Sequence, residues 1–207
     1  MKFGLKQLLP ENVKLVAGPG CPVCITSQND IDKMIALVLR GVEVASYGDM
    51  LRVPGTTTSM DEARAQGHKV SMVYSATEAL RLYEKNPGLV FFGIGFETTT
   101  PMTAYLLKHG VTVFSTHKLI IPAMKALMRG EMKIDGFICP GHVSTIIGSR
   151  VYEQLNFPQV ISGFKPEQIL HSTLLLVELI RDGKREVINN YREVVLPEGN
   201  QRAWALI

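Results

Sequence analysis

The stretch 89–101 reads Leu-Val-Phe-Phe-Gly-Ile-Gly-Phe-Glu-Thr-Thr-Thr-Pro and carries the signals of a strand, a turn and a helix start. The apolar run from Leu89 to Ile94 predicts a buried strand. The threonines and Pro101 are typical of the first turn of a helix. Glu97 lies between them, at the carboxyl end of the strand, where open α/β sheets bind their ligands. The two glycines match a dinucleotide-binding loop only weakly, because Thr98 stands where that fingerprint needs a third glycine.

The same alternation of strand and helix signals continues along the chain. Five more apolar segments are strand candidates: 43–46, 70–74, 111–114, 134–138 and 159–161. Helix candidates lie between most of them; one follows the capping residue Ser27, and another begins at Pro166. Alternating strands and helices predict an α/β fold with mainly parallel sheets.

The sequence Asn86-Pro87-Gly88 is the clearest break near the middle of the chain. Each side holds enough strand and helix candidates for a small sheet. We therefore expect two small α/β lobes, residues 1–87 and 88–164, with mainly parallel sheets that face a cleft. Residues 165–207 are expected to form a helical and extended segment that packs back on the lobes. The alternative is one continuous sheet, since a chain of this length also fits a single domain.

Composition excludes several classes of function. The 207 residues are 46% hydrophobic and 20% charged, as in ordinary globular proteins. The net charge of +3 is mild and the basic residues are spread along the chain, so we expect no nucleic-acid partner. No segment has the roughly 18 consecutive apolar residues of a spanning helix, and the first residues lack the apolar stretch of a signal peptide. We expect a cytoplasmic protein without membrane contacts.

Two of the three cysteines lie in the loop Gly18-Pro19-Gly20-Cys21-Pro22-Val23-Cys24. Gly20 permits close approach of a ligand beside the first thiol, whereas the prolines restrict the backbone. The short apolar run 13–17, a strand candidate, precedes the loop, and the helix-start signal follows it. We therefore expect the thiols between a strand and a helix, near a positive helix end that favours thiolates. In a reducing compartment such a pair is more often redox-active or metal-binding than a structural disulfide.

Cys139-Pro140-Gly141-His142 follows the strand candidate 134–138 and places a thiol and an imidazole at another strand end. His142 is a candidate metal ligand or proton carrier, with a hydrogen-bonded structural histidine as the alternative. Cys139 is most simply a small buried residue. With Cys21 and Cys24 these two have the ligand count of a Cys₃His zinc site, although their wide separation in the sequence makes this a weak signal.

Other polar residues in loops give less specific signals. Asp49 and Arg52 lie in the loop-rich stretch 47–55, where they could line a cleft or form a local ion pair. His117 follows the strand candidate 111–114, and the sequence does not decide its role.

Taken together, these motifs resemble those of the HypD family, proteins that mature nickel-iron hydrogenases. The matching segments span nearly the whole chain: 3–5, 8–13, 18–24, 47–49, 52–55, 93–101, 140–144 and 199–200. The resemblance implies two α/β lobes and a cluster-binding C-terminal part. It also implies a scaffold on which iron with cyanide and carbon monoxide ligands is assembled, together with a HypC-like chaperone and a HypE-like cyanide donor.

The resemblance also implies the site residues. Cys21 and Cys24, next to Gly20, match the family's redox and iron-handling pair. Glu97 with the hydroxyls of Thr98 and Thr99 matches one cleft motif, and Gly141 with His142 matches another. As catalytic groups we expect Cys21, Cys24, Glu97 and His142, with Gly20, Thr98, Thr99 and Gly141 contacting the iron-bound ligands.

The chain departs from the family pattern at both ends. Family members carry a Cys-Gly-x-His-x-His motif before the position of Phe3 and a four-cysteine [4Fe-4S] motif beyond that of Ile207, and neither is present here. We therefore expect either a central fragment of such a protein or a degenerate or mis-started member of the family, with its maturation activity impaired. Cys139 has no counterpart among the family cysteines and is a candidate for a substitute third thiolate.

Two alternatives to the maturation scaffold stay open. One is a stand-alone thiol-disulfide oxidoreductase, with Cys21 as the nucleophile and Cys24 as the resolving thiol. The other is an inert α/β interaction module. The scaffold itself is expected to be an accessory with thiol redox chemistry rather than an enzyme with ordinary turnover.

Overall fold

The computed structural model describes residues 4–207, apart from the side chains of Leu5 and Lys6. The chain forms two compact units. The first, here called the four-stranded unit, comprises residues 21–118 and 206–207. The second, the three-stranded unit, comprises the residues up to 20 together with 119–205.

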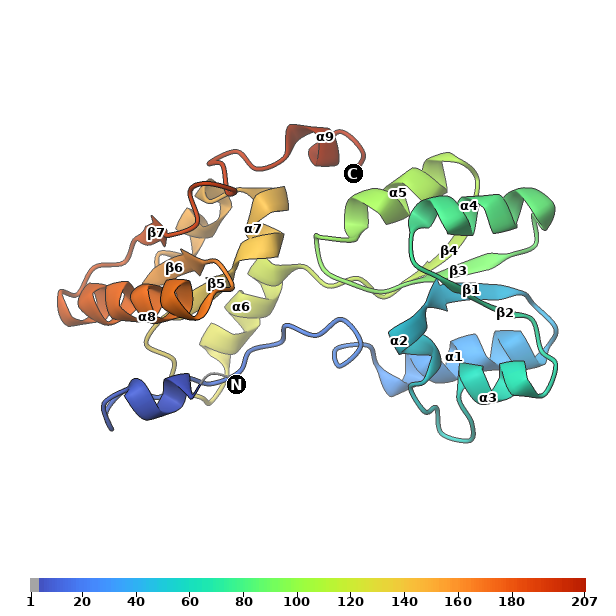
Figure 1. Cartoon of the computed structure of the whole chain (residues 1–207), viewed down its shortest axis with the longest axis horizontal. Coiled ribbons are helices and arrows are strands. Elements are labelled where there is room, and N and C mark those ends of the chain that lie inside the picture. The colour runs from blue at the N-terminus through green and yellow to red at the C-terminus, as the bar shows by residue number, and fades with distance from the viewer. Residues whose placement is uncertain (1–3) are drawn as a thin grey trace. The chain divides into compact units, whose positions relative to one another are not determined.

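The four-stranded unit is a parallel sheet with strand order β2-β1-β3-β4 (Figure 1). Its strands are β1 (Val44–Tyr47), β2 (Val70–Val73), β3 (Val90–Gly93) and β4 (Thr112–Ser115). Its helices are α1 (Gln28–Leu39), α2 (Gly48–Leu51), α3 (Met60–Ala65), α4 (Ala76–Lys85) and α5 (Thr100–Lys108). Helices α1 and α3 cover one face of the sheet, and α4 and α5 cover the other.

Successive residues of each strand point to opposite faces of this sheet. Val44 and Phe92 pack with the helices of one face, whereas Ala45 and Phe91 pack with those of the other. This alternation follows from the two-residue period of a strand. Because apolar side chains point both ways, the two central strands, β1 and β3, are buried on both faces, as is usual for parallel sheets between helices.

Helix α1 forms as its sequence signals predict. The Ser27 side chain accepts a hydrogen bond from the Asp30 N–H and caps the helix. The residues of its apolar face are buried: Ile31, Met34, Ile35 and Val38. The helix is joined to β1 by a short loop and therefore runs antiparallel to the strands. Its N-terminus lies at the carboxyl edge of the sheet.

The three-stranded unit is a smaller parallel sheet of order β5-β6-β7. Its strands are β5 (Phe137–Pro140), β6 (Gln159–Ser162) and β7 (Val187–Asn189). Its helices are η1 (Leu5–Leu8), α6 (Ile120–Arg129), α7 (Gly141–Ile147), η2 (Arg150–Leu155), α8 (Pro166–Arg181) and α9 (Gln201–Trp204). Leu176 and Leu179 of α8 pack on Val160 of β6 and form one apolar cluster of its core.

The predicted class, α/β with mainly parallel sheets, is confirmed. The boundaries between the two units, however, do not lie at the predicted break at Pro87. That break lies in the loop between α4 and β3, and β3 pairs with β1 within the first sheet. Likewise, β7 lies beyond residue 164 yet pairs with β6. A Pro-Gly signal marks a loop within a sheet as readily as a boundary between domains, so it misplaced the first division.

A second difference concerns the segment before the cysteines. Residues 13–17, expected to form a strand, lie in no helix or strand.

Among the described residues, none of the helices combines the length and apolar character needed to cross a membrane.

Candidate functional site

The strand order of the four-stranded unit reverses between β1 and β3. From β1 the chain moves outward to β2 and then returns to β3 on the other side. In open α/β sheets, ligands bind at the carboxyl ends of the two strands that flank such a switch point. Asp49 follows β1 at this edge, and Glu97 follows β3. Because α1 begins at the same edge, the cysteine loop that precedes it also lies there.

The cysteine loop is a series of tight turns. The Ile25 N–H donates to the Cys21 carbonyl at 3.3 Å, and the Thr26 N–H donates to that of Val23 at 3.2 Å. The buried Thr26 hydroxyl donates to the Pro22 carbonyl at 3.0 Å. Both thiols are free and exposed, and the Cys24 N–H donates to the Cys21 sulfur at 3.3 Å. The loop therefore presents two thiols to solvent with one sulfur already hydrogen-bonded.

The pKa values of the two thiols are shifted in opposite directions. Hydrogen bonds from the Cys24 side chain and then from its backbone N–H lower the pKa of Cys21, against a smaller opposing effect of the Asp49 charge. The same thiol hydrogen bond raises the pKa of Cys24, which keeps its proton. Local hydrogen bonds thus favour a Cys21 thiolate beside a Cys24 thiol. Thiolates are the nucleophilic and metal-binding form of cysteine.

The glycines at the end of β3 and just after it are explained by close packing. Gly95 has a φ of +145°, and a Cβ there would overlap with Thr99 Oγ1. A Cβ on Gly93 would lie 3.1 Å from Cε1 of His117. The spacing that weakly resembled a nucleotide loop therefore makes room for these two side chains.

The predicted residues Glu97, Thr98 and Thr99 occupy three different environments in the turn that follows β3. Glu97 is buried, and Thr98 is exposed. The Thr99 hydroxyl lies 3.0 Å from the Ile94 carbonyl, to which it donates. The threonines are typical of a helix start, but the Thr99 side chain makes no capping hydrogen bond to α5.

His117 is a residue of this edge whose role the sequence left undecided. It lies just beyond β4, half-buried among the hydroxyls of Ser115, Thr99 and Thr103. Burial lowers the pKa of its imidazole. The signal that could have found it is its position directly after a strand end, the same signal that identified Glu97.

His142 and Gly141 lie at the carboxyl edge of the three-stranded sheet. The exposed His142 ring stacks on Phe164, with ring centroids 4.0 Å apart, and Phe164 contacts Tyr191 edge-on at 6.4 Å. A Cβ on Gly141 would lie 2.9 Å from Cδ1 of Tyr191. Phe164 follows β6 and Tyr191 follows β7, so the imidazole lies beside an aromatic pair at the carboxyl ends of these strands. Sequence reasoning missed Phe164 and Tyr191.

Cys139 is a structural thiol, in agreement with its simplest prediction. It is buried, its sulfur lies 3.8 Å from Oε1 of Gln159, and burial raises its pKa. Gln159 also donates to the Tyr152 carbonyl at 2.9 Å. The thiol therefore belongs to a buried polar network. Within neither unit, as far as residues 4–207 are described, do three or more His, Cys, Asp or Glu gather as a possible metal site.

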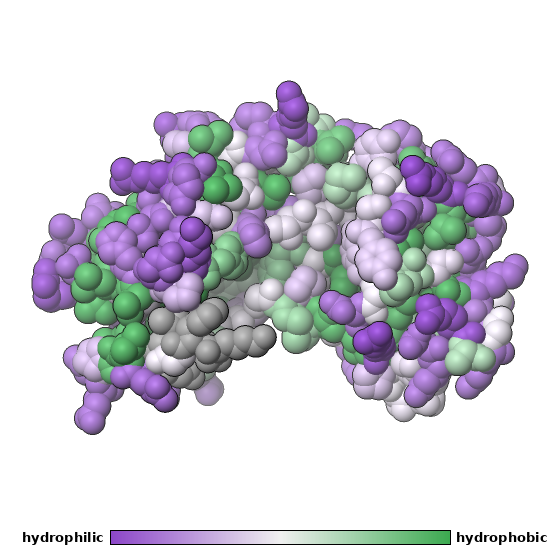
Figure 2. Space-filling model, in the orientation of Figure 1, coloured by the Kyte–Doolittle hydropathy of each residue, from purple (hydrophilic) through white to green (hydrophobic). Residues whose placement is uncertain are grey.

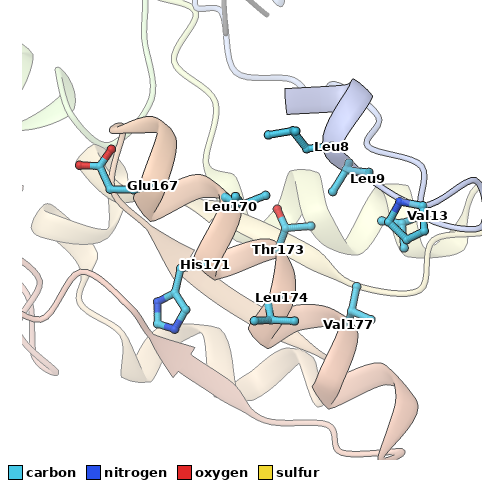
Figure 3. A pocket seen from close by; sticks show the side chains of 10 residues that line it. Leu8, Leu9, Val13, Glu167, Leu170, His171, Thr173, Leu174 and Val177 are labelled. Carbon is cyan, nitrogen blue, oxygen red and sulfur yellow. The ribbon is translucent and has the colours of Figure 1, made fainter. Parts of the chain in front are cut away.

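A cavity of about 450 Å³ lies elsewhere in the three-stranded unit, between the N-terminal segment and α8 (Figure 3). Its lining is mostly apolar and includes Leu8, Leu9, Val13, Leu170 and Leu174. None of the predicted site residues lines it. On the face that Figure 2 shows, apolar side chains are interspersed with polar ones on both units.

Comparison with known proteins agrees with these motifs. Residues 1–207 match the HypD family, described as "Hydrogenase formation hypA family". The chain is 41% identical over 226 residues to the hydrogenase maturation factor HypD of Rhizobium leguminosarum bv. viciae, covering 99% of this chain and 59% of that protein. It is 43% identical over 226 residues to HypD of Azotobacter vinelandii, with 99% and 60% covered.

A third relative also has a name that refers to hydrogenase formation. The chain is 39% identical over 219 residues to a putative hydrogenase expression/formation protein of Methanocaldococcus jannaschii, covering 100% of this chain and 61% of that protein. The chain thus spans about three fifths of the length of these relatives. A match along its whole length, with relatives near 40% identity, shows that the chain belongs to the HypD family.

Proposed function

We propose that this chain acts in hydrogenase maturation, as the part of a scaffold that holds iron while its cyanide and carbon monoxide ligands are assembled. One observation carries the proposal: two exposed thiols, one of them favoured as a thiolate, lie at the ligand-binding edge of the four-stranded sheet. The curated relatives are named as hydrogenase maturation factors, which supports the general role.

The chemistry of the cysteine pair suits this substrate. Thiolates are soft ligands and stabilise iron that also carries cyanide and carbon monoxide. Binding would take the proton from Cys24, because both sulfurs must be thiolates to ligate the metal. Thr98 exposes a hydroxyl at the same edge, and a hydroxyl can donate to the nitrogen of a bound cyanide. Glu97 would accept or supply protons there.

The partners proposed are a HypC-like chaperone that carries iron and a HypE-like donor of cyanide. A [4Fe-4S] cluster does not fit the residues of this chain. Such a cluster needs four ligands, usually cysteine thiolates, whereas the chain has three cysteines. One of these, Cys139, is buried with a raised pKa.

A thiol-disulfide oxidoreductase is the second candidate, favoured by the asymmetry of the pair. The Cys21 thiolate would attack a substrate disulfide and release one of its sulfurs as a thiolate. Cys24, after losing its proton, would then attack the Cys21 sulfur, leaving a Cys21–Cys24 disulfide and a reduced dithiol substrate. This reaction needs no iron, so iron binding distinguishes the two candidates.

The test is anaerobic titration of the reduced chain with ferrous iron, followed by thiolate-to-iron charge-transfer absorption. The variants are Cys21→Ala and Cys24→Ala, with Cys139→Ala as the matched control because its thiol is buried in the other unit. The scaffold predicts one ferrous ion bound by the wild type and the control, and loss of binding in both other variants. Absence of thiolate-dependent binding in the wild type would refute it.

A further inference from the structure

The hydrogen bonds around His117 determine which of its ring nitrogens carries the proton. Nε2 lies 3.1 Å from Thr99 Oγ1 and 3.4 Å from Thr103 Oγ1, and Nδ1 lies 2.9 Å from Ser115 Oγ. Each of these contacts joins a ring nitrogen to a hydroxyl, and either side could in principle donate. The remaining bonds of the hydroxyls decide the direction.

Thr99 and Thr103 each use their only hydroxyl proton on a carbonyl. Thr99 Oγ1 lies 3.0 Å from the Ile94 carbonyl oxygen, and Thr103 Oγ1 lies 3.2 Å from that of Thr99. Carbonyl oxygens can only accept, so both hydroxyls must donate to them. Nε2 therefore carries a proton and donates to the threonines. With the ring neutral, as its lowered pKa favours, Nδ1 accepts from Ser115.

The same ring fills the space beside the glycines at the end of β3 and in the turn that follows. Cβ atoms on Gly93 and Gly95 would lie 3.1 and 3.4 Å from His117 ring carbons. The backbone on each side of His117 is hydrogen-bonded to this segment. The Thr116 N–H donates to the Gly93 carbonyl and the Lys118 N–H donates to the Gly95 carbonyl, both at 2.9 Å. His117 is thus in contact with the turn through its ring and through its neighbours.

We propose that His117 is a positioning residue: as a neutral imidazole protonated on Nε2, it holds Thr99 and the turn 93–99 in the shape that presents Glu97 and Thr98. The adjacent threonines then have different roles. The Thr99 hydroxyl serves the fold, whereas the Thr98 hydroxyl is exposed and left for a ligand. The ligand role of Glu97 and Thr98 rests on the proposed function, but the tautomer and the shape of the turn do not.

The first test is nitrogen-15 NMR of the histidine rings in the wild-type chain at neutral pH. The proposal predicts that His117 has a protonated Nε2 and an unprotonated Nδ1. The chemical shifts of the two ring nitrogens should then differ by nearly the full amount expected for a single tautomer. A proton on Nδ1, or rapid averaging between the two tautomers, would overturn it. The spectrum needs no variant, so a failure to fold cannot obscure the result.

The second test compares His117→Gln with His117→Leu by amide hydrogen exchange. Gln carries a donor at a similar reach, whereas Leu cannot donate. Losing a hydrogen bond of about 1 kcal/mol predicts roughly fivefold faster exchange in His117→Leu at the amides of Thr99 and Lys118. His117→Gln should retain most of the protection. The exposed His109, changed to Gln and Leu, is the matched control.

Unchanged exchange at these amides in His117→Leu would contradict the positioning role. Repeating the ferrous titration on the same variants separates this proposal from the proposed function. If the wild type binds no iron, the scaffold fails while the tautomer and exchange results still stand. If the wild type binds iron, His117→Leu should bind it several-fold more weakly than His117→Gln.

Discussion

Replacing Gly95 by alanine tests whether the turn after β3 depends on close packing. The φ of +145° is one that side-chain-bearing residues rarely adopt, and the new Cβ would overlap with Thr99 Oγ1. Backbone strain of this kind costs on the order of 1–3 kcal/mol. Moving Thr99 would also break its bonds to Ile94 and His117, at about 1 kcal/mol each. We expect a loss of about 3–5 kcal/mol in the free energy of unfolding.

Gly67→Ala is the matched control for this substitution. Gly67 also has a positive φ, +95°, but a Cβ there would meet no atom within 4 Å. It lies in the same four-stranded unit, so both variants affect the same unfolding transition. The free energy of unfolding of the control should therefore fall only by the cost of backbone strain. The difference between the variants isolates the overlap with Thr99.

The assay is urea unfolding followed by far-ultraviolet circular dichroism, with Thr99→Ala and the double variant completing a cycle. Because Thr99→Ala removes the overlapping oxygen, the double variant should be more stable than the sum of the single losses predicts. Gly95→Ala and Gly67→Ala with equal stability, or strictly additive losses in the cycle, would refute the packing argument.

Three further predictions concern neighbouring residues. Thr99→Val should lower the free energy of unfolding by about 1–2 kcal/mol in the same assay, whereas Thr98→Val should change it by less than about 0.5 kcal/mol; the reverse order would contradict their assigned roles. Because burial depresses the pKa of His117, its neutral form stabilises the fold above the unfolded-state pKa, and this contribution is lost as the pH falls through the folded-state pKa. His117→Gln should therefore show a weaker loss of stability between about pH 7 and 5, and an unchanged profile would argue against a buried neutral imidazole. Cys24→Ala removes the main donor to the Cys21 sulfur, so alkylation of Cys21 at neutral pH should slow; an equal or faster rate would exclude this hydrogen bond as the cause of its acidity.

Sequence reasoning was most successful where local signals and burial agree. The cap at Ser27 and the apolar spacing from Ile31 to Val38 predicted α1, and continuous apolar runs predicted strands such as β3. These signals depend on residues that are close in sequence. Strand pairing depends on distant residues, so the break at Pro87 gave no information on which strands share a sheet.

The candidate site was predicted in part, and partly for an incorrect reason. The cysteine loop was expected at a strand-to-helix junction, but residues 13–17 form no strand. Its place at the carboxyl edge follows instead from the antiparallel course of α1. The role of His117 could not be predicted, because it depends on hydroxyls from β4, from the turn before α5 and from α5 that only the fold brings together. The same holds for the bond between Cys139 and Gln159.

The central claim is that Cys21 and Cys24 together ligate iron. The most direct measurement is X-ray absorption spectroscopy of the anaerobic chain loaded with one equivalent of ferrous iron. The proposal predicts two sulfur neighbours at about 2.3 Å, the usual metal–thiolate distance, and one in Cys21→Ala or Cys24→Ala if iron is retained. A first shell of oxygen and nitrogen alone in the wild type, or sulfur neighbours that persist in both variants and vanish in Cys139→Ala, would contradict it.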